Sequence, residues 1–142
     1  MNAIHEYTLV IPAEAIDANR HANNVEYVRW MQEAAISHAD AAGGTTATRA
    51  AGASWVVRSH HVEYLRPVFA DETVTLQTWV STLRKTSSLR KYRFVRGSEL
   101  IARGETMWVF VDASTGRPRA IPEGVLSVFV LVPPEKEPSG WK

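Results

Sequence analysis

A dense group of polar side chains lies between residues 17 and 27. Asp17, His21, Asn23 and Asn24 supply a carboxylate, an imidazole and two carboxamides within a few positions, directly before an apolar stretch with helical spacing. Polar groups at the entrance to a buried helix cost stability unless they are used. The start of a helix also presents backbone N–H groups and positive potential. A carboxylate beside such donors can attack a carbonyl carbon, or activate water to do so.

The element that must position these groups is a helix predicted from Asn23 to Ala41. Its polar residues recur every three or four positions and form one narrow stripe: Glu26, Arg29, Glu33, Ser37 and Asp40. The remaining faces are apolar, so other structure must wrap this helix. Gly43 and Gly44 are expected to end it.

The rest of the chain has the pattern of strands. Strands are predicted over Ile4–Ile11, Trp55–Leu65, Thr73–Leu83, Ser88–Arg96 and Leu100–Asp112. Short joins after residue 65 favour antiparallel neighbours. Residues 45–52 are expected to form a loop or a helical turn, and the valines of 125–132 favour a last strand. These elements predict an α+β fold, a curved antiparallel sheet around one central helix, whose long edges favour pairing of two copies.

Size and composition indicate a single domain over residues 1–132, followed by a flexible tail over residues 133–142. Hydrophobic residues make up 45% and charged residues 22% of the chain, as in ordinary soluble proteins. No apolar run is long enough to span a membrane and no signal peptide is visible, so the expected location is the cytoplasm. The absence of cysteine excludes disulfides and thiolate catalysis, and no spaced ligand cluster indicates a metal site.

The charge distribution has one notable feature. The net charge is only +1, but residues 73–98 contain no acidic residue. The basic residues in this range are Arg84, Lys85, Arg90, Lys91, Arg93 and Arg96. They form either a solvated hairpin or a docking site for a phosphorylated ligand or an acidic carrier protein. A nucleic-acid partner is not expected, because no recognised binding motif accompanies these residues.

The polar stretch resembles the N-terminal signature of hot-dog-fold thioesterases of the 4-hydroxybenzoyl-CoA and acyl-CoA thioesterase type. That signature is D-x-x-G-H-V-N-N-x-x-Y, and here it spans Asp17 to Tyr27. Residues 61–67, 71–74, 102–106, 112–118 and 121–122 also resemble later strands and turns of the family. The resemblance implies a hot-dog fold that hydrolyses an acyl thioester carried by coenzyme A or, second, by acyl carrier protein. It implies no cofactor beyond the coenzyme A of the substrate.

The same resemblance implies roles for individual residues. Asp17 corresponds to the catalytic carboxylate, acting as nucleophile or as general base, and the Asn24 backbone N–H corresponds to the donor that polarises the carbonyl. His21 either orients Asp17, contacts substrate or supports the loop. Asn23 and Tyr27 are further candidates for substrate contact, with helix capping and core packing as their alternatives.

The position before His21 departs from the signature. The family has Gly where this chain has Arg20, and Arg adopts a positive φ less readily than Gly. We therefore expect either a different loop shape or a contact between Arg20 and ligand.

Other candidates for substrate binding lie on the predicted strands and in the join between residues 83 and 88. His60 is expected to line the acyl cleft near Asp17 of a second copy, in a homodimer or a dimer-of-dimers tetramer. The candidates for contacting CoA phosphates or a carrier protein are Arg58, Arg84, Lys85, Ser87, Ser88 and Arg90. Two alternative functions remain open, a hydratase or dehydratase on the same fold and a non-catalytic acyl-binding protein.

Overall fold

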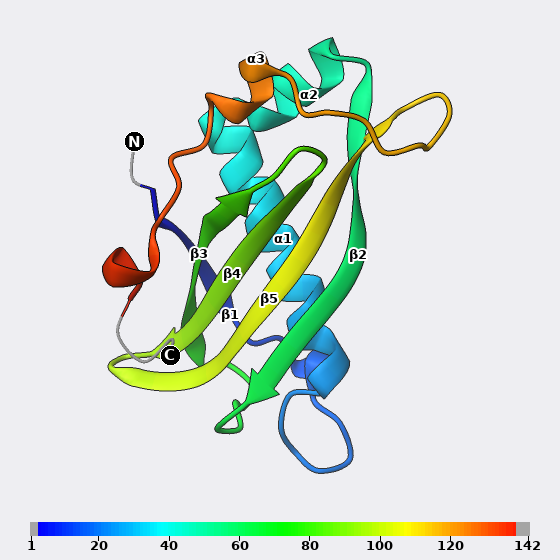
Figure 1. The fold of residues 1–142 in the computed structure, drawn as a ribbon. Coiled ribbons are helices and arrows are strands. Elements are labelled where there is room, and N and C mark those ends of the chain that lie inside the picture. Colours follow the sequence, from blue (N-terminus) through cyan, green and yellow to red (C-terminus); the bar gives the residue numbers. More distant parts are fainter. Residues whose placement is uncertain (1–2, 139–142) are drawn as a thin grey trace.

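The computed structural model of the chain describes residues 3–138. An antiparallel sheet with strand order β1-β3-β4-β5-β2 curls around the long helix α1 (Figure 1). The strands are β1 (His5–Val10), β2 (Ala53–Tyr64), β3 (Thr73–Leu83), β4 (Ser87–Arg96) and β5 (Glu99–Asp112). The helices are α1 (Asn24–Ala42), α2 (Gly44–Ala50) and α3 (Glu123–Leu126), with 3-10 turns at Ala13–Ala15 and Pro134–Lys136. This α+β arrangement is the predicted hot-dog fold.

Helix α1 begins and ends where the sequence indicates. The Asn23 side chain caps it by accepting a hydrogen bond from the Val25 N–H at 3.0 Å, and Gly43 closes it with a φ of 87°. The predicted helix over residues 23–41 is thus confirmed within one residue at each end. The residues on its buried face are Tyr27, Trp30, Met31, Ala34, Ala35 and His38.

One glycine lets α1 lie close to the sheet. A Cβ atom on Gly104 of β5 would come within 2.8 Å of the Met31 Sδ atom. Met31 is fully buried, so it has little room to move away. Gly104 therefore helps to set the distance between helix and sheet.

The predicted strands up to residue 112 match β1 to β5 within two residues. The strand predicted over residues 125–132 is wrong, because α3 occupies its start and the rest is not a strand. The side of β3 that this segment approaches is already paired with β1 as far as Thr78. Only the Val132 N–H reaches that edge, where it donates to the Val80 carbonyl at 3.0 Å.

The segment after Pro133 packs against the face of the sheet opposite α1. The Glu137 carboxylate accepts a hydrogen bond from the Trp79 Nε1–H at 3.1 Å and pairs with the Lys91 Nζ at 2.9 Å. The Glu137 side chain is almost fully buried. A flexible tail was predicted over residues 133–142; up to residue 138 the chain instead has these contacts, and residues 139–142 lie outside the described residues.

Strand β2 forms one edge of the sheet and pairs only with β5 among the described strands. It is twelve residues long, and most of its residues are exposed or half-buried. Large apolar side chains are exposed along this side of the molecule: Val25 and Ile36 on α1, and Val56 and Tyr64 on β2. A long apolar edge of this kind favours pairing with another chain.

Within residues 3–138, no helix is both long and apolar enough to cross a membrane.

Candidate active site

The polar residues expected to do chemistry lie in a tight turn directly before α1. The Asp17 N–H donates to the His21 carbonyl at 3.1 Å, and the Arg20 N–H donates to the Asp17 carbonyl at 3.0 Å. The Asp17 carboxylate accepts a hydrogen bond from the Asn19 N–H at 2.8 Å. The loop itself therefore fixes the direction in which this carboxylate points.

Neighbouring segments hold this turn in place. The Ala22 N–H donates to the Val68 carbonyl and the Asn23 N–H donates to the Ala15 carbonyl, both at 2.9 Å. A backbone bridge between Ile16 and Ala22 closes the base of the turn. The half-buried Asp17 thus sits on a braced backbone, which suits a group that must meet a substrate in one orientation.

Arg20 adopts the left-handed conformation, with a φ of 69°. A residue with a Cβ atom is strained there by about 1–2 kcal/mol, whereas Gly is not. Arg20 therefore takes a conformation that the Gly of the signature would adopt with less strain. Its side chain is exposed and hydrogen bonds to no residue within 3–138.

The start of α1, directly after the turn that holds Asp17, presents a backbone donor. The Asn23 side chain and carbonyl accept from the N–H groups of Val25 and Glu26, each at 3.0 Å. The Asn24 N–H donates to no residue within 3–138, and the Asn24 carbonyl accepts from the Tyr64 hydroxyl at 2.9 Å. The first turn thus keeps one amide available where the helix dipole is positive.

His21 and Tyr27 have no hydrogen bond to the Asp17 carboxylate among residues 3–138. The His21 ring has one long contact, 3.4 Å to the Ala22 carbonyl, and no hydrogen bond to the Asp17 carboxylate. Tyr27 is buried in the core, edge-on to Trp30 and Tyr64, and burial raises the pKa of its hydroxyl to about 12. The structure therefore joins His21 to Asp17 through the backbone and places Tyr27 in the core.

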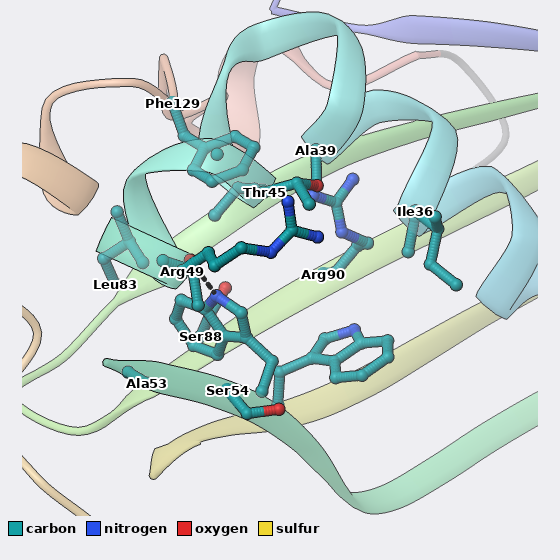
Figure 2. A pocket seen from close by; sticks show the side chains of 16 residues that line it. Ile36, Ala39, Thr45, Arg49, Ala53, Ser54, Leu83, Ser88, Arg90 and Phe129 are labelled. Atoms are coloured by element: carbon teal, nitrogen blue, oxygen red, sulfur yellow. Dashed lines mark hydrogen bonds between the residues drawn. The ribbon is translucent and has the colours of Figure 1, made fainter. Parts of the chain in front are cut away.

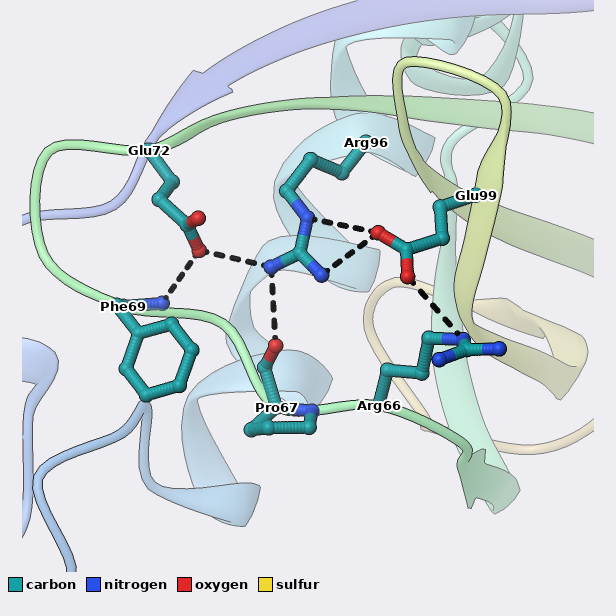
Figure 3. Close-up of polar contacts among 6 residues, drawn as sticks. All are labelled: Arg66, Pro67, Phe69, Glu72, Arg96 and Glu99. Carbon is teal, nitrogen blue, oxygen red and sulfur yellow. Dashed lines mark hydrogen bonds and ion pairs between the residues drawn. The ribbon is translucent and has the colours of Figure 1, made fainter.

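A network of ion pairs supports the segment behind the turn (Figure 3). Arg96 donates to Glu72 at 2.9 Å, to Glu99 at 2.8 Å and to the Pro67 carbonyl at 3.1 Å. Arg66 adds a contact to Glu99 at 3.3 Å. Because Pro67 precedes the residue that accepts from Ala22, Arg96 helps to position the turn.

A cavity of about 410 Å³ lies between the second half of α1, α2 and the inner face of the sheet (Figure 2). Its walls are mainly apolar and include Ile36, Ala39, Trp55, Leu83, Trp108 and Phe129. Its size is in the usual range for small-ligand sites. Ala53, Ser54 and Trp55, at the start of β2, also line it.

The residues predicted to contact CoA lie in different places, some in the cavity and others at the surface. Ser88 and Arg90 are buried and line the cavity. Arg84 and Lys85 are exposed in the β3–β4 turn, which directly follows the cavity residue Leu83. Arg58 is exposed on β2, and Ser87 is half-buried at the start of β4.

The six basic residues of 73–98 therefore form no single patch. Four of them have polar partners within residues 3–138: Arg90, Lys91, Arg93 and Arg96.

His60 lies on the inner face of β2. Its Nδ1 is 2.8 Å from the Thr106 hydroxyl, and burial lowers the pKa of its imidazole. It does not line the cavity within one chain. Among residues 3–138, no three His, Asp or Glu side chains are grouped so that they could hold a metal ion.

Sequence reasoning missed a buried polar cluster beside the cavity. His38 of α1 and Thr78 of β3 both contact Arg90, and Phe129 covers the group. The spacing of His38 from Met31 and Ala35 was a usable signal, because it puts His38 on the buried face of the helix.

The fold and the site define a hot-dog protein with a carboxylate set before its central helix. A family model described as the thioesterase-like superfamily matches residues 11–129. The match covers most of the chain, so this protein belongs to the thioesterase-like superfamily.

Individual relatives extend the comparison. The acyl-CoA thioester hydrolase YbgC of Escherichia coli is 32% identical over 77 residues, which are 54% of this chain and 58% of YbgC. The chain thus matches little more than half the length of these curated relatives.

Two solved structures show the shared fold. A hypothetical protein from Aquifex aeolicus has a TM-score of 0.82 at 21% identity, over 89% of this chain and 99% of that one. A hypothetical protein from Staphylococcus aureus, in complex with CoA, has a TM-score of 0.79 at 15% identity, over 88% of this chain and 80% of that one.

Proposed function

We propose that this protein hydrolyses an acyl thioester, with coenzyme A as the carrier, to a free acid and a thiol. The observation that carries the proposal is the Asp17 carboxylate fixed in the turn directly before α1, a helix whose first amide, the Asn24 N–H, has no partner within residues 3–138. The superfamily, the name of the YbgC relative and the CoA bound to the S. aureus neighbour point to the same chemistry.

The proposed reaction uses these two groups. The thioester carbonyl oxygen accepts a hydrogen bond from the Asn24 N–H, which stabilises the negative charge that develops on it. Asp17 either attacks the carbonyl carbon, forming an anhydride that water then opens, or removes a proton from the water that attacks. In both routes the C–S bond breaks, the thiolate leaves and takes up a proton, and a carboxylic acid remains. Thiolates leave readily, so neither route needs a metal or a resident cofactor.

Within one chain, Asp17 and the cavity lie at opposite ends of α1, a helix on the order of 28 Å long. Strand β2 runs between the same two places. Its first residues line the cavity, and its last residue, Tyr64, donates to Asn24 next to the turn.

We infer that two copies pair through β2. In an antiparallel pair of β2 strands related by a two-fold axis, the start of one strand lies beside the end of the other. Asp17 of one copy then lies beside the cavity of its partner. This arrangement covers the exposed apolar edge and brings together the base, the amide donor and the acyl pocket.

Arg58, Arg84 and Lys85 are the proposed contacts for the phosphates of CoA, since all three are exposed. Replacing Arg84 and Lys85 by Gln should raise KM for an acyl-CoA. KM for the same acyl group on N-acetylcysteamine, which lacks phosphates, should not change. An equal rise for both substrates would show that these residues act in some other way.

Thiol release from a panel of acyl-CoAs tests the proposed function. Asp17→Asn should abolish release, because Asn can neither attack nor take up a proton, whereas Asp71→Asn, in an exposed loop, should retain it. Release that persists in Asp17→Asn would contradict the mechanism. Hydration of an enoyl-CoA without thiol release would favour a hydratase, and tight binding of acyl-CoA without turnover would favour a non-catalytic binding protein.

A further inference from the structure

The cavity is lined by a buried arginine that uses only one of its three side-chain nitrogens for hydrogen bonds. Arg90 extends from β4 toward α1 near Ala39 (Figure 2), and only 5% of its surface is exposed. Its Nη1 donates to the His38 Nδ1 at 2.8 Å and to the Thr78 hydroxyl at 3.1 Å. Its Nε and Nη2 donate to no residue within 3–138. Three N–H donors of one fork are therefore available beside a cavity that Arg90 lines.

No carboxylate within residues 3–138 forms an ion pair with Arg90. Burial, and next the charge of Arg90, lower the pKa of His38 to about 3, so His38 is a neutral acceptor and supplies no negative charge. The Phe129 ring, 5.7 Å from the guanidinium carbon, provides a cation–π contact. Burial lowers the pKa of Arg90 to about 10, so the side chain remains charged at neutral pH.

On the opposite face of β4, another cationic side chain has an ion-pair partner. Lys91 is also largely buried, and it pairs with Glu137 at 2.9 Å. A buried cation without such a partner is costly, and this cost is recovered when a ligand supplies the anion. Arg49 of α2 also points into this cavity (Figure 2), and most of the remaining wall is apolar, so an anion attached to an apolar chain fits it.

We propose that the acyl group bound in this cavity ends in a carboxylate that pairs with Arg90, so that the substrate is the monothioester of a dicarboxylic acid. The inference rests on the proposed thioesterase function and names its substrate class. The terminal carboxylate accepts from Nε and Nη2 in the bidentate geometry that guanidinium favours. The methylene chain contacts walls such as Ile36, Trp55 and Leu83. The thioester end extends toward Asp17 of the other copy.

Substrates matched in length give the first test. Adipoyl-CoA and hexanoyl-CoA differ only in whether the chain ends in a carboxylate or a methyl group, as do glutaryl-CoA and pentanoyl-CoA. We expect kcat/KM for thiol release to be about 10²–10³ times higher for the carboxylate member of each pair, the range for a buried charged hydrogen bond. Equal rates, or a preference for the methyl member, would overturn the inference while leaving the thioesterase function intact.

Arg90→Met should remove this preference. Kcat/KM for adipoyl-CoA should fall about 10²–10³-fold, whereas that for hexanoyl-CoA should be unchanged or rise. Arg93→Met is the matched control, because Arg93 lies on the opposite face of β4 and donates to Gln77. An equal loss for both substrates in Arg90→Met would show that Arg90 only maintains the fold. An apolar replacement of a buried charge is often tolerated, which favours Met for this test.

A binding measurement separates this inference from the proposed function. By calorimetry, free adipate should bind the wild-type protein and the Arg93→Met variant, and hexanoate should bind much more weakly. If no thioester is hydrolysed but adipate binds in this way, the proposed function fails and the anion site stands. If adipate and hexanoate bind equally, the inference fails. Should Arg90→Met not fold, the wild-type comparisons of substrates and acids decide the question.

Discussion

At the scale of single residues, the proposed hydrolysis needs one backbone amide as much as one carboxylate. Asn24 is the first residue of α1, and its N–H is the proposed donor to the carbonyl oxygen. Proline is favoured at this helix position because no hydrogen bond within the helix is lost. The preceding Asn23 has φ −64° and ψ 137°, a conformation that proline accepts in its neighbour.

Asn24→Pro therefore removes the amide donor and keeps the helix. We expect kcat for thiol release to fall by about 10²–10³-fold, as for other oxyanion donors, with little change in melting temperature. Asn24→Ala retains the N–H and should keep most of the activity. Full activity in Asn24→Pro would show that this amide does not contact the reacting carbonyl.

A second residue-scale prediction concerns Arg20, whose φ is positive. Arg20→Gly should raise the free energy of unfolding by about 1 kcal/mol, because Gly relieves the strain at that φ. Ala18, in the same turn, has no positive φ, so Ala18→Gly should lower it. Denaturant titration measures both changes, and destabilisation by Arg20→Gly would point to a role for the Arg20 side chain in the fold.

Buried histidines should make the fold sensitive to acid. Burial and Arg90 lower the pKa of His38 to about 3, and burial also lowers the pKa of His5 and His60. The unfolded chain, with a histidine pKa of about 6.5, therefore takes up protons first. Stability is fully present above that pH and is lost as pH falls, by about 1.4 kcal/mol per pH unit for His38.

His38→Asn provides the check, because it keeps an acceptor for Arg90 but does not titrate. The slope of unfolding free energy between about pH 6.5 and 4.5 should become shallower than in the wild type. An unchanged slope would mean that His38 is not held neutral in the folded protein.

At the scale of elements, what the sequence could predict follows from local signals. Helix α1 was predicted within one residue at each end because Asn23 and Gly43 mark its ends and its polar stripe is periodic. The strand predicted over residues 125–132 failed because strand formation depends on an available edge, which sequence composition does not show. Burial of Arg90 could not be predicted either, since its cavity is built from residues distant in the chain.

A substitution in the C-terminal segment tests whether this segment packs against the sheet or forms the flexible tail that the sequence predicts. Glu137 accepts from Trp79 and pairs with the largely buried Lys91. Glu137→Ala should lower the free energy of unfolding by about 3 kcal/mol, because it removes the carboxylate that pairs with the largely buried Lys91 and accepts from Trp79. Glu135→Ala, at an exposed position of the same 3-10 turn, should have little effect. Equally small changes in the free energy of unfolding for both variants would support the flexible tail that the sequence predicts.

At the scale of the whole molecule, the two halves of the site lie at opposite ends of α1. The hot-dog fold was predicted correctly, but the distance between Asp17 and the acyl cavity became visible only once the chain was folded. The exposed edge of β2 connects these ends and supplies a surface through which two copies can complete one another. If two copies pair in the proposed way, catalysis is a property of the pair and not of a single chain.

Mixing two inactive variants tests whether Asp17 of one copy and the cavity of the other copy act together. The first variant, Asp17→Asn, lacks the carboxylate but keeps its cavity. The second variant, Ala39→Phe, keeps Asp17 but has its cavity filled by the larger side chain. After subunit exchange of equal amounts, half of the dimers are mixed and each has one intact site, so the mixture should recover about one quarter of wild-type thiol release. A mixture that remains as inactive as its components would show that Asp17 and the cavity do not act together across two copies.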